Sequence, residues 1–156
     1  MSKNLSKTQK IKQKMYAEGF NRIESWLHDK GWTVDCDYCV RDEIFFNGKY
    51  ITISKRQGSE KRLYSLLHEC GHLLIQQNNT KYEEAYPAQA KMSQFLSNKR
   101  IEKSKDYRVE TLTEEIEAWK RGKNLADRLG IFVEDKNFQK LTNECIYTYI
   151  EWAAKP

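Results

Sequence analysis

Two histidines and a glutamate stand at the spacing of a metal-binding motif. The chain reads His68-Glu69-Cys70-Gly71-His72, which has the pattern His-Glu-x-x-His, in a segment predicted to be helical. Residues four apart on a helix share a face, so both imidazoles can reach one metal ion while the glutamate projects beside them. Zinc held by three protein ligands lowers the pKa of a bound water, and a nearby carboxylate can take that water's proton as it attacks a carbonyl. The motif predicts His68 and His72 as zinc ligands and Glu69 as the general base.

The alternative is that these residues fall together by chance. The chain has only three histidines, so two of them at this spacing around a glutamate are less expected than in a histidine-rich chain. Apolar flanks on both sides make the predicted helix a core element, and Gly71 within it costs on the order of 1 kcal/mol of helix stability. We interpret that cost as a sign that bulk is unwelcome beside the ion.

A zinc site needs a third protein ligand, and the remaining histidine, His28, lies far upstream. No histidine or cysteine stands at the +6 spacing that metzincins use, which leaves the carboxylates Glu114, Glu115 and Glu117. At about 100° per residue, Glu115 falls near the middle of an apolar arc, and a carboxylate facing the core is costly unless it is paired or binds a metal. The arc consists of Leu112, Ile116, Trp119, Leu125, Ala126 and Leu129.

Glu115 is therefore the predicted third ligand. The alternative for this residue is a partly exposed glutamate in the first turn of its helix, where a negative charge is favourable. Glu114 is interpreted as part of a helix cap and Glu117 as a residue of the solvated face.

The motif helix and the second acidic helix together resemble the ImmA/IrrE-like gluzincin metallopeptidases, a broad group with small phage-encoded members. The resemblance rests on HExGH followed by Glu-x-Glu-Ala and covers Ile44 to Ala126. It implies a minimal zincin-like domain in which a β-hairpin leads into the HExxH helix and a downstream helix supplies a glutamate, here Glu115. In that family an Asn or Asp tends to stand four residues after the ligand glutamate, whereas this chain has Trp119.

The elements that must position these residues begin with a basic segment. Residues 1–14 carry five lysines and no acid and are expected to be frayed and flexible, running into a helix that ends near Gly31. Between residues 32 and 54, aromatic and β-branched runs flank Asn47-Gly48, which is the strongest short-range hairpin signal. A short antiparallel sheet is therefore expected ahead of the motif helix.

The rest of the chain is predicted to be mostly helical. Ser59 can cap the motif helix, and the polar stretch 78–110 is expected to be an insert, with a helix around 88–96 followed by a mobile loop. Thr111 and Glu114 match a capping box that opens a helix running to Gly130, and a last helix follows from about Asn137 to Trp152. The predicted fold class is α+β and helix-dominated, with a single metallopeptidase domain over residues 15–156.

Length and composition agree with such a domain. A chain of 156 residues with 39% hydrophobic residues can build one core. No run approaches the ~20 apolar residues needed to cross a bilayer, and the N-terminus lacks the apolar stretch of a signal peptide. The expected location is a cytoplasm, the host's if the chain is phage-encoded, with the four cysteines reduced. Cys36 and Cys39 have the spacing of half a zinc knuckle. The alternative is that they are thiols at the edge of the hairpin.

The leading functional expectation is a zinc-dependent peptidase with one zinc per chain and a protein or peptide substrate. A catalytically silent zincin-fold binding or regulatory protein, or a zinc hydrolase acting on a non-peptide amide, are the alternatives. The insert carries tyrosines that either donate to an oxyanion or simply pack. It also carries a basic patch that either touches nucleic acid or is a solvated face. The tyrosines are Tyr82, Tyr86 and Tyr107, and the patch is Lys99, Arg100, Lys103 and Lys105.

Overall fold

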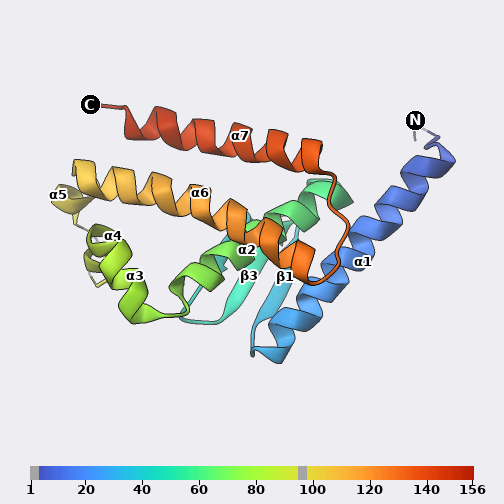
Figure 1. Cartoon of the computed structure of the whole chain (residues 1–156), viewed down its shortest axis with the longest axis horizontal. Helices are drawn as coiled ribbons and strands as arrows, with labels where there is room; N and C mark the ends of the chain where they lie inside the picture. The colour runs from blue at the N-terminus through green and yellow to red at the C-terminus, as the bar shows by residue number, and fades with distance from the viewer. Residues whose placement is uncertain (1–3, 95–97) are drawn as a thin grey trace. The chain divides into compact units, whose positions relative to one another are not determined.

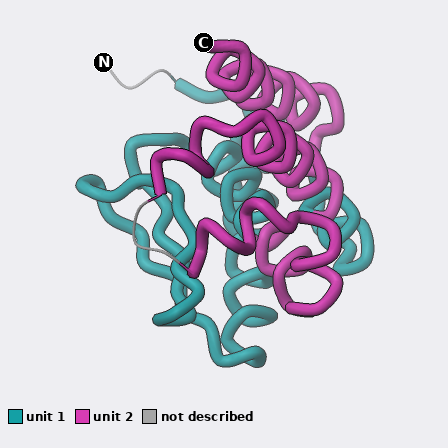
Figure 2. The backbone as a smooth tube through the Cα atoms, turned by 90° about the vertical axis from the view of Figure 1, so that its left-hand side faces the viewer, with its two compact units in different colours: residues 1–69, 122–133 teal, residues 70–121, 134–156 magenta. Residues whose placement is uncertain are grey.

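The computed structural model describes residues 4–94 and 98–156 (Figure 1). In these ranges the chain forms seven helices and one three-stranded sheet, which confirms the helix-dominated α+β class. The chain divides into two compact units, residues 1–69 with 122–133 and residues 70–121 with 134–156 (Figure 2). Two of the boundaries fall inside continuous helices, α2 (Ser59–Gln76) and α6 (Lys105–Arg128), so the expectation of a single domain stays a prediction.

The first unit opens with helix α1 (Lys7–Asp29). Ser6 caps it: the Ser6 hydroxyl accepts from the Gln9 N–H at 3.2 Å, and the Gln9 side chain accepts from the Ser6 N–H at 2.9 Å. This reciprocal cap satisfies backbone donors at the helix start, so residues 7–14 are helical where the sequence suggested a frayed segment. Residues 1–3 of that segment lie outside the described residues.

The sheet consists of β1 (Thr33–Asp37), β2 (Glu43–Phe45) and β3 (Tyr50–Ser54) in the order β1-β3-β2. The hairpin around Asn47-Gly48 is confirmed, because β2 and β3 pair antiparallel. The fully antiparallel sheet is wrong, because β1 pairs parallel with β3.

Burial explains why β3 takes the centre of the sheet. Its two isoleucines, Ile51 and Ile53, are 0% exposed, so β3 is the strand most shielded from water. Alternation in a sequence shows which face of a strand is buried, but it does not show which strands are its neighbours. The sequence pattern therefore could not predict that β1 is the parallel partner of β3.

Helix α2 has the predicted extent and begins in the first unit. Its residues Leu63, Leu66 and Leu67 are completely buried. Gly122 of α6 lies against it so closely that a Cβ there would be 2.4 Å from the Leu67 carbonyl oxygen. The backbones of α2 and α6 are thus in direct contact in this unit.

The second unit holds the predicted insert, which is more helical than expected. It forms α3 (Asn79–Ala85), α4 (Pro87–Ser93) and the short α5 (Lys99–Glu102). Asn78 and Asn98 cap α3 and α5 by accepting backbone N–H groups with their side chains. The expected mobile loop before residue 111 is therefore mostly helix. Residues 95–97, where the predicted insert helix would have ended, lie outside the described residues.

Helix α6 begins at Lys105, so the predicted capping box at Thr111 is wrong. The cap is Ser104, whose hydroxyl accepts from the Tyr107 N–H at 3.2 Å. Thr111 instead donates its hydroxyl to the Tyr107 carbonyl at 2.8 Å, a bond to the preceding turn that places it in the helix interior. The predicted end is confirmed, because α6 ends at Arg128 and Gly130 follows with φ +63°.

Helix α7 (Asp135–Ala153) agrees with the predicted last helix and runs antiparallel to α6 within the second unit (Figure 1). The rings of Trp119 and Phe138 lie 5.4 Å apart, and those of Tyr107 and Trp152 lie 6.3 Å apart. These aromatic pairs join α7 to α6 near both ends of α7. A search of the described helices for a membrane-crossing segment finds none that combines the necessary length and apolar character.

Candidate metal centre

The structure brings the three predicted ligands together. Ligand atoms of His68, His72 and Glu115 all lie within 4.8 Å of one another. His68 and His72 stand one turn apart on the continuous helix α2, and Glu115 comes from α6 in the same unit as His72. In the described part of the chain, no other cluster of histidine, cysteine and acidic side chains meets this criterion, so Cys36 and Cys39 do not form a second site. The group can hold a metal ion.

The contact between His72 and Glu115 has the spacing of two ligands on one ion. His72 Nε2 lies 3.1 Å from Glu115 Oε1, and both side chains are nearly buried. In a tetrahedral zinc site with bonds of about 2.0–2.1 Å, neighbouring donor atoms are about 3.3 Å apart. The residues present therefore fit zinc in donor type, and the His72–Glu115 pair fits it in spacing.

Glu115 points inward as predicted, with 7% exposure, but the buried face of α6 follows the predicted arc only in part. Trp119, Leu125 and Ala126 of that arc are buried. Ile116, predicted to be part of that arc, is 38% exposed, whereas Glu114 is only 4% exposed. The buried stripe is turned toward Glu114, Ala118 and Trp119 because polar partners on α2 accommodate both glutamates. Packing on the helix thus selected the glutamate that lies in the group with His68 and His72, with a helix phase that was partly wrong.

Glu114 was interpreted as a cap residue, and this interpretation is wrong. It lies in the interior of α6, where its Oε1 is 3.4 Å from His72 Nδ1 and accepts a 2.8 Å hydrogen bond from Gln76 Nε2. The sequence contained a signal for this polar group, because Gln76 stands four residues after His72 and shares its helix face.

Gly71 has a different role from the one inferred for it. A Cβ at this position would lie 1.9 Å from the carbonyl oxygen of Ala118, well inside van der Waals contact. The glycine makes room for the backbone of α6, whereas the sequence suggested that it made room for the ion. This close approach brings the α6 turn that carries Glu114 and Glu115 within reach of His72.

Glu69, the predicted base, is 6% exposed, and its Oε1 lies 3.6 Å from His68 Nδ1. It is thus a largely buried carboxylate next to one of the ligand imidazoles. Glu117 lies on the outer side of α6, as predicted. It pairs with Arg121 at 2.9 Å, and Arg121 also donates to the Leu74 carbonyl at 3.1 Å. Glu117 therefore helps to attach α6 to α2 without joining the metal group.

The tyrosines of the insert mainly pack. Tyr86 belongs to a small core with Ile75 and Ala118, and Tyr82 lies against it with its ring centroid 5.4 Å from that of Tyr86. Burial raises the pKa of both tyrosines, and the charge of Glu114 raises it further. Both hydroxyls therefore stay protonated at neutral pH. Tyr107 packs against Trp152.

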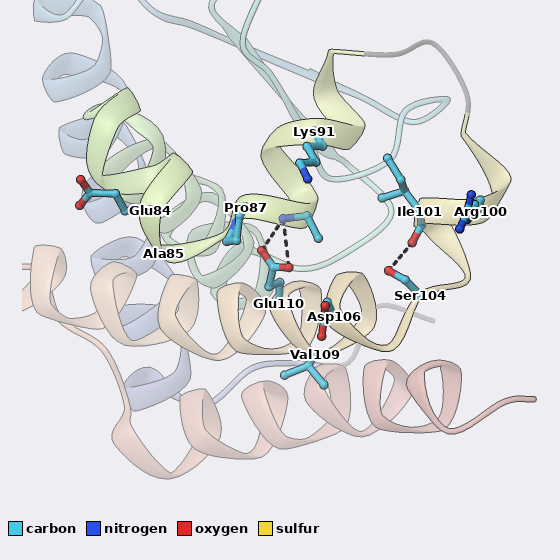
Figure 3. A pocket seen from close by; sticks show the side chains of 11 residues that line it. Glu84, Ala85, Pro87, Lys91, Arg100, Ile101, Ser104, Asp106, Val109 and Glu110 are labelled. Carbon is cyan, nitrogen blue, oxygen red and sulfur yellow. Dashed lines mark hydrogen bonds between the residues drawn. The ribbon is translucent and has the colours of Figure 1, made fainter.

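The short helices of the insert and the first turns of α6 line an open pocket of about 920 Å³, shown in Figure 3. Glu110 reaches from α6 to the start of α4, where its carboxylate accepts from the Ala88 N–H at 2.9 and 3.1 Å. The wall carries both signs of charge, with Arg100 of the predicted basic patch facing the same pocket as Asp106. This mixture favours no single ligand charge.

Comparison with protein family models, with characterised proteins and with solved structures gives no match to this chain. The resemblance to ImmA/IrrE-like gluzincins stays a prediction.

Proposed function

We propose that this chain is a zinc-dependent metallopeptidase that holds one zinc through His68, His72 and Glu115. The observation that carries the proposal is the convergence of these three ligand atoms within 4.8 Å, with the carboxylate of Glu69 next to His68. Two imidazoles and one carboxylate suit zinc, whereas calcium and magnesium prefer sets of oxygen ligands. Three protein ligands also leave a coordination position open, which is typical of catalytic zinc.

Bound zinc supplies a Lewis acid and lowers the pKa of a coordinated water toward neutrality. Glu69 acts as the general base: its carboxylate accepts a proton from the attacking water and can return it to the departing amine nitrogen. A site that only stabilised the fold would not need a carboxylate beside the ligand His68. The presence of Glu69 therefore favours hydrolysis over a purely structural metal.

The substrate class that follows is a protein or peptide, and the compartment we propose is a cytoplasm. The four cysteines, all in the described part of the chain, are not joined in disulfides, and reduced thiols are the rule in a cytoplasm.

The proposal is tested by preparing the protein free of metal, adding zinc in measured steps, and assaying a fluorescence-quenched peptide library at each step. We expect cleavage to rise with zinc and to level off at about one equivalent per chain. A His68→Ala, His72→Ala double variant, purified in parallel, controls for contaminating proteases and should stay inactive. Failure to bind zinc would overturn the metal centre, and zinc binding without cleavage would favour a binding or regulatory protein.

A further inference from the structure

His72 has a carboxylate facing each of its two ring nitrogens. Nε2 lies 3.1 Å from Glu115 Oε1, and Nδ1 lies 3.4 Å from Glu114 Oε1. Consecutive residues of a helix point about 100° apart, so the two glutamates approach the ring from different sides. Glu115 belongs to the group that can hold a metal and Glu114 does not, so the burial of Glu114 beside His72 must have another reason.

Glu114 is itself held by a second residue of α2. Gln76 Nε2 donates to Oε1 of Glu114 at 2.8 Å, the same oxygen that faces His72. His72 and Gln76 stand four residues apart and therefore share one face of α2. A carboxylate that is only 4% exposed is costly unless it is hydrogen-bonded, and these two contacts both meet that need.

We propose that Glu114 is the positioning residue of His72: it accepts the Nδ1–H of the imidazole and so directs the Nε2 lone pair to the metal. The proposal rests on the proposed function, since it assumes that His72 is a ligand. A neutral imidazole carries one N–H, and fixing that proton on Nδ1 leaves Nε2 free to coordinate. Metal-binding histidines generally donate their second N–H in this way, which fixes the ring orientation and raises the basicity of the ligand.

A purely structural role would differ in its consequences. If Glu114 only joined the end of α2 to α6 through Gln76, its removal would lower stability and leave the zinc affinity of the folded protein unchanged. If Glu114 acts through His72, the zinc affinity must fall even where the fold is intact. The two roles are therefore separated by measuring affinity and ring protonation in addition to stability.

The experiment compares Glu114→Gln, which keeps the shape, and Glu114→Ala with the matched control Glu117→Gln on the outer side of the same helix. Circular dichroism checks folding, and competition with a chromogenic chelator gives the zinc affinity. We expect Glu114→Ala to lose about 100-fold and Glu114→Gln about tenfold, the range seen when such outer partners are removed. The amide of the Gln variant still accepts a hydrogen bond, but a weaker one. Glu117→Gln should bind like the parent.

A second measurement reads the imidazoles directly, by nitrogen-15 NMR of the zinc-loaded proteins with signals assigned from single histidine variants. The parent should show a His72 Nδ1–H protected from exchange with water, and Glu114→Ala should lose that protection while the signals of His68 stay in place. Parent affinity and an unchanged His72 signal in the Glu114 variants would overturn this inference alone. If Glu114→Ala does not fold, the Gln variant decides. A parent that binds no zinc would overturn the proposed function together with the inference.

Discussion

Gly71 and Ala118 stand so close that a single methyl group on the glycine would lie 1.9 Å from the alanine's carbonyl oxygen. This contact sets the distance between α2 and α6 at the turn next to His72. Glu114 and Glu115 lie one turn before Ala118, so the same approach brings both carboxylates to the imidazole. The position of both carboxylates beside His72 therefore depends on Gly71, a residue without a side chain.

Gly71→Ala should destabilise the protein, although alanine is the better helix former by about 1 kcal/mol. Backbone atoms cannot yield as a flexible side chain would, so overpacking should dominate and cost about 1–3 kcal/mol net. Urea unfolding of the zinc-free protein measures this. Gly58→Ala is the matched control, because a Cβ at Gly58 meets nothing within 4 Å. A Gly71 variant as stable as the parent would mean that α2 and α6 are not in backbone contact at Gly71 and Ala118.

Glu115→Ala should lose more zinc affinity than any other single glutamate variant of α6, because it removes a ligand whose Oε1 lies 3.1 Å from His72 Nε2. Glu117→Ala should bind zinc like the parent, since Glu117 pairs with Arg121 on the outer side of the helix. Chelator competition gives both affinities. The reverse order, with zinc lost on changing Glu117 and kept on changing Glu115, would show that the orientation of α6 is wrong.

Glu110 should give the stability of the zinc-free protein a small, recognisable pH dependence. Burial raises its pKa above 4.5, although its hydrogen bond to Ala88 partly offsets this. Between 4.5 and that raised value the folded state binds more protons than the unfolded state, so this contribution to stability falls as pH rises. Glu110→Gln should remove that part of the slope. Urea unfolding at closely spaced pH values checks it, and a slope identical to the parent's would contradict the burial of Glu110.

Zinc should stabilise the folded protein, because its ligands come from two helices and are not assembled in the unfolded chain. At a free zinc concentration 100 times the dissociation constant, the gain is about 2.7 kcal/mol. Thermal melting with zinc and with a chelator measures the difference. The double variant His68→Ala, His72→Ala should melt at one temperature under both conditions, and a zinc-dependent shift in that variant would place the ion elsewhere.

Short-range signals in the sequence predicted much of this architecture. Helical spacing alone predicted that His68, Glu69 and His72 lie together on one helix. Turn chemistry predicted the hairpin at Asn47-Gly48, and Gly130 predicted the end of α6. Long-range contacts decided the rest. The parallel pairing of β1 depends on which strand is most buried. The start of α6 depends on Ser104, and not Thr111, being the cap. The role of Glu114 depends on the close approach of α2 and α6 at Gly71.

Peptide cleavage by Glu69→Gln, at a zinc content equal to that of the parent, tests most directly whether this site hydrolyses peptides with Glu69 as its base. Glutamine keeps the shape of the side chain but lacks the basicity needed to accept the water proton. We expect about one zinc per chain in both proteins, cleavage of the quenched-peptide library by the parent, and no cleavage above background by the variant. Cleavage by Glu69→Gln at the parent's rate, with equal zinc bound, would contradict the assignment of Glu69 as the catalytic base.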